Sequence, residues 1–330
     1  MGIKEDILEY CSSLGLDTVG FIKCRKFEEL KDFYEDRKLK GLENEFEEES
    51  IENRINPNIY MKEGKTIISI AFPYLHNIDY IENGFSMYTR GLDYHKVVKE
   101  YLEKISNYIN SLGGNAITFV DSNTLPERYI AYLSGIGFIG KNNMIITKKY
   151  GSYVFLGEII TDLEIQCEDI RTFSEISSFK ECGNCEICYS ECPTKAINRI
   201  RKNSNICVSY LTQKKDLEDK FIKLLDGRVF GCDSCQKKCP YNLEVEYSTI
   251  KDFYPLNFMN EENSDFLINM GNKEFKETFQ ITSCGWRGKN VLKRNAIIRK
   301  KYNGENIDGF KTDSPYLKDY IHRLFFRNKI

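Results

Sequence analysis

The apolar positions in the first half of the chain follow two kinds of pattern. Residues 3–14 and 92–112 carry apolar side chains at helical spacing, whereas short continuous apolar runs predict buried strands at residues 18–24, 66–72 and 116–120. A strand, a crossover helix and a second strand in succession are typical of a βαβ unit. The first half is therefore predicted to be α/β, with its functional groups at the carboxyl ends of the strands.

The pattern changes further along the chain. The elements predicted there are a helix at residues 125–133, strands at 144–146 and 153–160, and amphipathic helices at 290–301 and 316–325. A cysteine-rich stretch separates the strands from the last two helices. These changes predict three domains, an α/β domain over residues 1–165, a metal-binding domain over residues 166–245 and a short α-helical domain over residues 246–330.

Charge is nearly balanced over the 330 residues, with 47 basic against 49 acidic side chains, but it is distributed unevenly. Residues 43–52 hold six acids and no base, which predicts an exposed helix or loop. Residues 286–330 hold 12 Lys or Arg against four Asp or Glu, which suits a nucleic-acid-facing surface or a solvated helical face. No apolar run reaches the roughly 20 residues of a membrane span, and the N-terminus resembles no secretory signal. We therefore expect a cytoplasmic protein with no membrane partner.

Eight of the 12 cysteines follow a pattern that is typical of a pair of iron–sulfur clusters. The first four have the spacing C-x2-C-x2-C-x3-C-P, the bacterial run whose fourth cysteine serves a second cluster. The next segment repeats C-x2-C-x3-C-P and so lacks one ligand, for which Cys207, between the two segments, is the candidate. The crossing-over rule predicts two ligand sets, each for one [4Fe–4S] cluster: Cys182, Cys185, Cys188 and Cys239, and Cys192, Cys207, Cys232 and Cys235.

Zinc sites and disulfides also use paired cysteines, but both suit this chain less well than iron–sulfur clusters do. Zinc accepts four thiolates, but zinc ribbons rarely add a third cysteine at this spacing and then a Cys-Pro dipeptide. Disulfides are not expected in a reducing compartment. The cysteines outside the pattern are predicted to be structural and dispensable for iron binding: Cys11, Cys24, Cys167 and Cys284.

The N-terminal half offers one candidate acid and no nucleotide-binding motif. No G-x-G-x-x-G follows a strand, no P-loop is present, and the glycine-rich residues 135–143 predict a tight turn. Asp121 follows a predicted strand, where a carboxyl group buried beside a flat apolar ligand could hold a proton near neutral pH. The alternative role of Asp121 is to cap the next helix. His95 opens a D-x-H sequence, but Val98 stands where a D-x-H-x-x-G cobalt-binding loop has glycine, so that role is rejected.

Several sequence blocks in a fixed order resemble epoxyqueuosine reductase, a family of cobalamin-dependent iron–sulfur enzymes that complete queuosine in tRNA. The blocks are VDSNTLPERYIAYLSGIGFIGKNN, GSYVFLGEIITDLEI, CGNCEICYSECPTKAI, CVSYLT and GCDSCQKKCPYN, followed later by WRGKNVLKRNAII. The resemblance runs from about Arg54 to Asn242 and resumes at Trp286. It departs from the family's D-S-x-P-V-x-E-R at Thr124, which replaces proline, and Pro126 lies two places later.

The resemblance implies a fold and a set of cofactors. It implies an α/β N-terminal cobalamin-binding domain, a ferredoxin-like domain with two [4Fe–4S] clusters, and a short α-helical (HEAT-like) C-terminal domain. The cobalamin would be base-off, without a protein imidazole below the cobalt, and would receive single electrons through the clusters. The family's proton donor falls on Asp121, which would protonate the departing epoxide oxygen. The residues implied to bind the cofactor are Arg54, Tyr88, Asp121, Lys141, Asn142, Ser209 and Tyr210.

The implied reaction is the reduction of epoxyqueuosine to queuosine, the last step of queuosine biosynthesis. The implied partners are tRNA carrying epoxyqueuosine and an external one-electron donor such as a flavodoxin or ferredoxin, and we expect a monomer. Phosphates of the tRNA are expected to contact Arg287, Lys289, Lys293 and Arg294. Two alternatives are a cobalamin-dependent enzyme like the reductive dehalogenases, which usually carry a twin-arginine signal that this N-terminus lacks, and a plain iron–sulfur electron-transfer protein.

Overall fold

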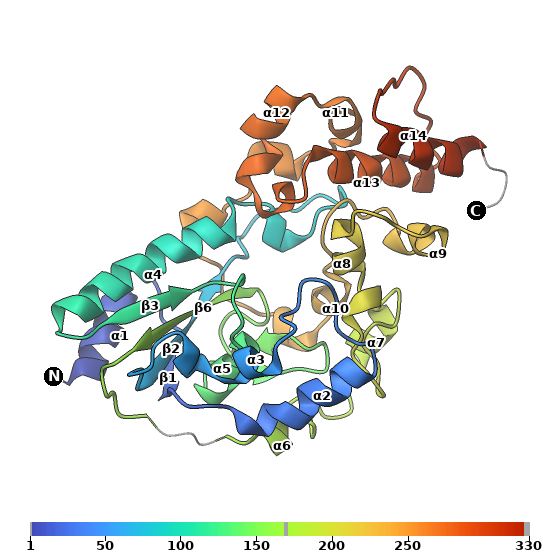
Figure 1. The fold of residues 1–330 in the computed structure, drawn as a ribbon. Helices are drawn as coiled ribbons and strands as arrows, with labels where there is room; N and C mark the ends of the chain where they lie inside the picture. Colours follow the sequence, from blue (N-terminus) through green and yellow to red (C-terminus); the bar gives the residue numbers. More distant parts are fainter. Residues whose placement is uncertain (1, 168–170, 327–330) are drawn as a thin grey trace.

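The computed structural model describes residues 2–167 and 171–326 and arranges them in three parts (Figure 1). A sheet flanked by helices occupies the lower left of this view, and the cysteine-bearing helices lie to its right. The C-terminal helices, coloured orange to red, lie above both. None of the helices in the described ranges combines the length and the apolar character that a bilayer-spanning segment needs.

Four strands form the central sheet in the order β1-β2-β6-β3. Their bounds are β1 Val19–Lys23, β2 Thr66–Pro73, β3 Ala116–Phe119 and β6 Val154–Thr161. The crossover from β2 to β3 that the sequence predicts is present, but β6 lies between these two strands and is antiparallel to both. Because β1 is also antiparallel to β2, all neighbouring pairs among the described strands of this sheet are antiparallel. The predicted βαβ unit is therefore split, although β2 and β3 still end at the same edge.

Helices cover both faces of this sheet. Helix α1 (Ile3–Ser13) packs against α4 (Tyr94–Ser111), and α4 lies on β3 and β6. Helix α5 (Glu127–Leu133) covers the opposite face, where it contacts β1, β2 and β6. All eight residues of β2 are buried, because alternate side chains enter two cores, such as Ile68 on the α4 side and Ile67 on the α5 side. The uninterrupted apolar run of this strand follows from its central position.

Shorter elements connect the sheet to the cysteine region. The glycine-rich turn is a hairpin between β4 (Phe138–Ile139) and β5 (Ile145–Ile146), which confirms the predicted turn. The other α-helices described before residue 245 are α2 Lys31–Leu39, α3 Ile51–Ile55, α6 Phe173–Ile176, α7 Ile187–Glu191, α8 Val208–Gln213, α9 Asp219–Ile222 and α10 Ser234–Lys237. Helices α7 and α10 each carry a pattern cysteine and pack against each other.

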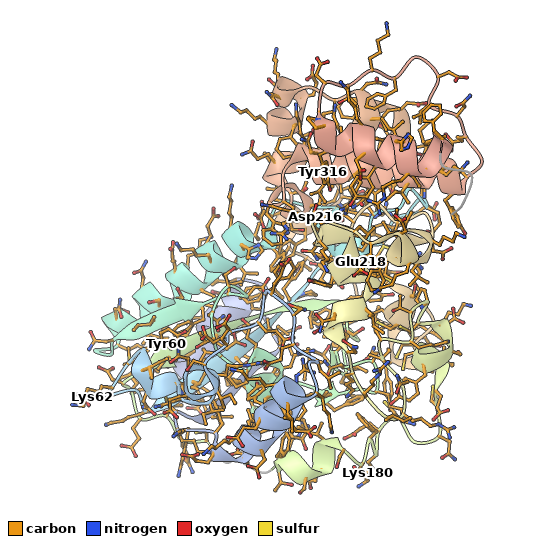
Figure 2. The ribbon with its side chains drawn as sticks, turned by 45° about the vertical axis from the view of Figure 1, so that its right-hand side comes forward. Tyr60, Lys62, Lys180, Asp216, Glu218 and Tyr316 are labelled. Carbon is orange, nitrogen blue, oxygen red and sulfur yellow. The ribbon has the colours of Figure 1, made fainter. Side chains whose placement is uncertain are left out.

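The C-terminal helices share a hydrophobic core with part of the cysteine region. Their bounds are α11 Ser264–Asn269, α12 Asn272–Glu277, α13 Lys289–Tyr302 and α14 Pro315–Ile321, with a π-helical segment His322–Phe326 after α14. Leu211 of α8 and Leu292 of α13 are both fully buried in this core. Figure 2 shows Tyr316 above Asp216 and Glu218 at the same junction. The core thus crosses the boundary predicted at residue 245, and the division into three domains stays a prediction.

Candidate functional site

Asp121 lies just beyond β3, at the edge where β2 also ends. Its backbone is left-handed, with φ of 45°, an uncommon conformation for a non-glycine residue that is enriched at active sites. The carboxylate accepts a hydrogen bond from the Tyr94 hydroxyl, and its side chain is 54% exposed. Helix α5 begins after Pro126 without a side-chain cap, so the alternative role of Asp121 as a helix cap is wrong. The Asp121 carboxylate is therefore partly exposed at this edge of the sheet.

His95 holds a proton next to Asp121. Its Nδ1 lies 2.8 Å from Asp93 Oδ1, and its Nε2 lies 3.1 Å from Asp121 Oδ2. Burial of the ring disfavours its charge, but the two carboxylates outweigh burial and raise the pKa of His95 to about 9. Partial desolvation of the carboxylate by neighbouring protein atoms favours a neutral Asp121, yet hydrogen bonds from His95 and Tyr94 lower the pKa of Asp121 below its ordinary value. In the protein alone, the proton therefore resides on His95 at neutral pH and not on Asp121.

Two further carboxyl groups lie close to Asp121 and were missed by the sequence reasoning. Glu127 begins α5, and burial together with the charge of Asp121 raises the pKa of Glu127 to about 7. Glu158 lies fully buried in β6, where Ser69 Oγ donates to its Oε1 over 3.4 Å. Burial and then the charge of Glu127 raise the pKa of Glu158 well above its ordinary value. The sequence did contain a signal for Glu158, which is an acidic residue inside an otherwise apolar strand. A buried carboxyl group must be neutral, paired or functional.

Aromatic side chains connect Asp121 to the cysteine region. The ring of Tyr94 stacks on Phe155 at 4.2 Å between centroids and meets the ring of Tyr88 edge-on at 6.4 Å. Burial raises the pKa of Tyr88 above its ordinary value, and a hydrogen bond with Ser209 opposes this effect. Ser209 belongs to α8, the helix that begins directly after a pattern cysteine. The structure thus brings together three of the residues predicted to bind a cofactor, namely Tyr88, Asp121 and Ser209.

The eight pattern cysteines gather into the two sets that the crossing-over rule predicts. Burial and three neighbouring thiols raise the pKa of Cys188 to about 11, the neighbours being Cys182, Cys239 and Cys185. Burial and three other thiols raise the pKa of Cys235 well above its ordinary value, the neighbours being Cys232, Cys207 and Cys192. Thiolates held this close repel one another, and bound iron would offset that repulsion. Their role as cluster ligands stays a prediction.

The first cysteine set surrounds a cavity of about 40 Å³, which Lys141 and Asn142 also line. Lys141 Nζ donates to the carbonyl oxygens of Gly183 and Cys185, at 2.8 and 3.0 Å. Asn142 Nδ2 donates to the carbonyl oxygen of Cys235 at 3.3 Å. Lys141 and Asn142 therefore fasten the hairpin to loops of both cysteine sets, and their predicted cobalamin contacts stay predictions. Within the described ranges, no three His, Cys, Asp or Glu side chains converge closely enough to hold a single metal ion.

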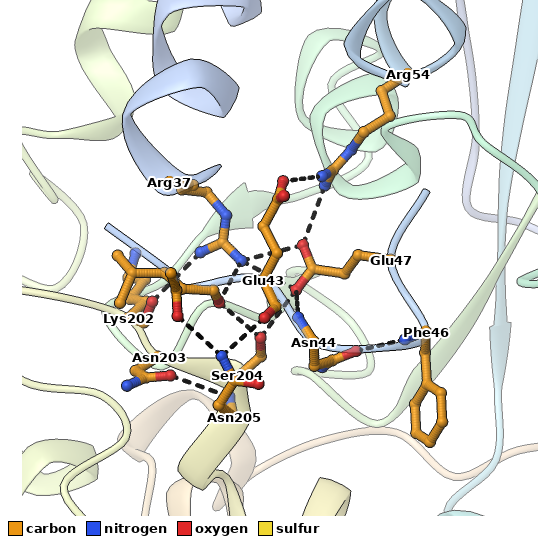
Figure 3. A network of polar contacts seen from close by, with 12 residues as sticks. Arg37, Glu43, Asn44, Phe46, Glu47, Arg54, Lys202, Asn203, Ser204 and Asn205 are labelled. Carbon is orange, nitrogen blue, oxygen red and sulfur yellow. Dashed lines mark hydrogen bonds and ion pairs between the residues drawn. The ribbon is translucent and has the colours of Figure 1, made fainter. Parts of the chain in front are cut away.

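Arg54 lies in a polar network with the acidic loop, which we define as residues 43–50 (Figure 3). It pairs with Glu43 at 2.7 Å and with Glu47 at 3.3 Å, and its guanidinium lies 3.8 Å from the centre of the Tyr34 ring. All three charged side chains are less than one-fifth exposed. Arg54 was predicted to bind the cofactor, but its positive charge is already balanced by its ion pairs with Glu43 and Glu47.

The same network ties the acidic loop to the cysteine region. Glu47 pairs with Arg37 at 3.1 Å and accepts a hydrogen bond from Ser204 Oγ at 2.8 Å (Figure 3). The ring of Phe46, the residue before Glu47, meets that of Tyr210 edge-on at 5.2 Å, so the loop contacts a residue predicted to bind the cofactor. The segment is a loop, as predicted, but it is only partly exposed, because Glu43 and Glu47 are held in ion pairs and hydrogen bonds with other segments.

The basic residues predicted to meet RNA phosphates have different environments. Arg294 is fully buried and donates to two backbone carbonyl oxygens between α8 and α9, so its predicted phosphate contact is wrong. Arg287 pairs with Glu45 of the acidic loop at 3.0 Å. Lys289 and Lys293 lie one turn apart on α13, and burial and then the charge of Lys289 lower the pKa of Lys293. These two lysines are the members of the group best placed to receive a phosphate.

Two family models match the chain. Residues 181–242 match a model described as a 4Fe-4S double cluster binding domain, and residues 54–122 match one described as epoxyqueuosine reductase QueG, DUF1730. The first range contains all eight pattern cysteines. The fold is therefore a mixed α/β arrangement that carries an iron–sulfur domain of the double-cluster class.

Known proteins with the same fold extend this likeness over nearly the whole chain. An epoxyqueuosine reductase of Bacillus subtilis (strain 168) is 34% identical over 312 residues, which cover 90% of this chain and 78% of that protein. A crystal structure of epoxyqueuosine reductase with a tRNA-Tyr epoxyqueuosine-modified tRNA stem loop matches with a TM-score of 0.88 and 32% identity, over 96% of this chain and 88% of that one. A structure of the Bacillus subtilis enzyme, described with its aspartate catalytic loop swung out of the active site, matches with a TM-score of 0.82 and 33% identity, over 91% and 81% of the two chains. This chain belongs to the epoxyqueuosine reductase family.

Membership in this family makes the chain an oxidoreductase. It favours the main interpretation of the sequence over the two alternatives, an enzyme like the reductive dehalogenases and a plain electron-transfer protein. The double-cluster model likewise supports iron–sulfur clusters in the cysteine region.

Proposed function

We propose that this chain reduces epoxyqueuosine in tRNA to queuosine. The reaction consumes two electrons and two protons, removes the epoxide oxygen as water and leaves a carbon–carbon double bond. The observation that carries the proposal is the placement of Asp121, an accessible carboxylate 3.1 Å from a protonated histidine, at a sheet edge that aromatic contacts connect to the cysteine region. The family relationship supports the substrate, and the catalytic aspartate loop of the Bacillus subtilis structure supports the role of Asp121.

The residues present suit two [4Fe–4S] clusters and a base-off cobalamin. Each cysteine set offers four thiolates, as a cubane requires. The stacked rings of Tyr94 and Phe155 suit the flat face of a corrin, and the hydroxyl groups of Tyr88 and Ser209 suit its amide-bearing rim. Cobalamin bound here would supply the low-potential electron chemistry that breaks the carbon–oxygen bond. Both ring nitrogens of His95 already face carboxylates, so His95 is not free to ligate cobalt.

Asp121 Oδ2 is the point of proton transfer in this proposal. The His95 imidazolium holds a proton 3.1 Å from that oxygen, and Asp93 fixes the ring through Nδ1 at 2.8 Å. As negative charge develops on the departing oxygen, Asp121 takes up the proton of the His95 imidazolium and passes it to that oxygen. Asp93 keeps the same ring orientation before and after the transfer, since its contact with Nδ1 does not involve the moving proton.

We further propose the organisation and the partners that the family resemblance implies. The chain acts as a cytoplasmic monomer with a cobalamin-binding domain over residues 1–165, a two-cluster domain over 166–245 and a helical domain over 246–330. Because [4Fe–4S] clusters pass electrons singly, the donor would be a one-electron carrier such as a flavodoxin or ferredoxin.

The proposed function is tested with the full chain, reconstituted without oxygen, and a stem loop containing epoxyqueuosine. With a low-potential one-electron reductant, we expect the released nucleoside to lose one oxygen atom, as measured by mass spectrometry. A strain that lacks the gene should accumulate epoxyqueuosine in its tRNA. An absence of conversion by protein that carries both clusters and cobalamin would contradict the proposal.

The pH dependence of the reaction should report on His95. Because its pKa is raised to about 9, His95 is charged throughout the neutral range, and the single-turnover rate should fall as the pH rises through about 9. His95→Gln should remove this alkaline limb. Glu127, with a pKa of about 7, is the other group that titrates nearby, so a limb near 7 that survives in His95→Gln would belong to Glu127. A limb near 9 that survives in His95→Gln would remove His95 from proton supply.

A further inference from the structure

Phe46, Trp286 and Arg287 form a partly exposed group, which we call the stacking patch. Trp286 is 54% exposed and Phe46 is 42% exposed, although both are large apolar side chains. Their rings meet edge-on at 5.3 Å between centroids, and the Arg287 guanidinium lies 4.6 Å from the centre of the Trp286 ring and 5.0 Å from that of Phe46. The patch therefore combines two aromatic rings with one planar cation at the surface.

Hydrogen bonds from two other segments hold the stacking patch in place. Trp286 Nε1 donates to Gln213 Oε1 at 3.1 Å, and Arg287 Nε donates to the Gln213 carbonyl oxygen at 2.7 Å. The remaining edge of the guanidinium pairs with Glu45 of the acidic loop at 3.0 Å. A ligand that stacks on the patch would therefore bind side chains that are already ordered, which lowers the entropic cost of binding.

The position of the stacking patch links the proposed active site to the C-terminal helices. On one side, Phe46 contacts Tyr210, the neighbour in sequence of Ser209, which hydrogen-bonds Tyr88 beside the catalytic group. On the other side, Trp286 and Arg287 directly precede α13, whose first turns carry Lys289 and Lys293. An aromatic face and an adjacent pair of cations match the base and the phosphates of a single-stranded nucleotide.

We propose that an unpaired base of the RNA hairpin loop, next to the modified nucleoside, stacks on the patch formed by Phe46, Trp286 and Arg287. Lys289 and Lys293 contact the phosphates beside that base. The inference rests on the proposed function, because it assumes that the substrate nucleoside is presented in an RNA loop. Proteins that recognise RNA loops commonly stack unpaired bases on aromatic rings and arginine planes, whereas paired stems offer no free base faces.

The test is the affinity of the reconstituted enzyme for a fluorescein-labelled tRNA-Tyr stem loop, measured by anisotropy over a range of salt concentrations. Trp286→Ala should weaken binding about 10- to 100-fold, the usual loss when a stacked base loses its aromatic partner. The salt dependence should keep its slope, because no phosphate contact is removed. Trp286→Phe should retain most of the affinity. Lys289→Ala with Lys293→Ala should weaken binding and also flatten the salt dependence.

Tyr302→Ala provides the matched control, since Tyr302 is 60% exposed at the far end of α13. Its affinity should equal that of the parent. Parent-like affinity in both Trp286→Ala and Phe46→Ala would overturn the inference. The inference would also be overturned if these two variants bound RNA normally but accepted electrons slowly from a flavodoxin, because the patch would then bind a protein partner. If the parent binds the stem loop through the patch but does not reduce it, the proposed function fails and the stacking inference stands.

Discussion

A Cys207→Ala protein should bind about four irons per chain, whereas the parent should bind about eight. Cys207 is the one predicted ligand outside both Cys-Pro runs, and it precedes the first residue of α8. Burial and then the neighbouring Cys232 raise the pKa of Cys207, which places its thiol in the second cysteine set. Its removal leaves that set with three thiols and leaves the first set complete. The electron path would be interrupted, so turnover should fall to background.

Iron and sulfide analysis of anaerobically purified protein measures this effect. Cys24→Ala is the matched control, because Cys24 is also half-buried but lies on the α5 side of the sheet and outside the cysteine pattern. The control should keep about eight irons. An iron content of about eight in Cys207→Ala would show that another residue completes the second set.

The two cysteine sets could be predicted from the sequence because cluster ligation imposes local spacing. Cysteines three positions apart reach one cubane without any knowledge of the tertiary fold, and Cys207 follows from the count of ligands. Lys141 and Asn142 are different, because they belong to a hairpin and hydrogen-bond loops of the two sets that lie 42 and 93 residues later in the chain. Such contacts depend on how distant segments pack, which spacing within a motif does not encode.

The pairing of the sheet was not predictable from periodicity for a related reason. The pattern identifies β2, α4 and β3 as a strand, a helix and a strand, and each is present. It does not indicate that β6, which follows later in the chain, inserts between the two strands. Periodicity reports which faces are buried, and β2 is buried on both faces in a parallel or an antiparallel arrangement. The carboxyl edge could be predicted, since it depends on strand direction alone.

The two segments with the strongest charge patterns, the acidic loop and the basic helix α13, were the ones whose surroundings the sequence predicted least well. The acidic loop and the basic α13 both suggested solvated or nucleic-acid-facing surfaces, yet Glu47 pairs with Arg37, and Arg294 is buried against backbone carbonyl oxygens. Glu47 and Arg294 each hydrogen-bond a segment distant in sequence, and such partners decide whether a charge faces solvent. Composition therefore located these segments without revealing their function, and the stacking patch became visible only when Phe46 and Trp286 were placed together.

Asp121→Asn should lower single-turnover reduction of an epoxyqueuosine-containing stem loop by roughly 10²- to 10⁴-fold, the usual contribution of a positioned general acid. The amide keeps the size of the carboxyl group and one acceptor for the Tyr94 hydroxyl, but it cannot take up a proton from His95 and pass it on. Both clusters should bind as in the parent, because the cluster cysteines are not among the contacts of Asp121, and cobalamin should bind because the amide keeps the shape of the carboxyl group. The loss should therefore appear in the rate at saturating RNA and not in RNA affinity.

The control for this substitution is Asp162→Asn, which removes the same charge at the opposite end of the sheet. Asp162 follows β6 and accepts hydrogen bonds from the Asn115 backbone and side chain, so its substitution leaves the group around His95 intact. Its rate should match that of the parent. Loss of the Asp121 carboxylate should also lower the pKa of His95 toward its ordinary value, because that carboxylate helps to hold the imidazolium charge. The alkaline limb of the residual activity should then move below 9, and a rate within a few-fold of the parent with an unmoved limb would remove Asp121 from the proton path.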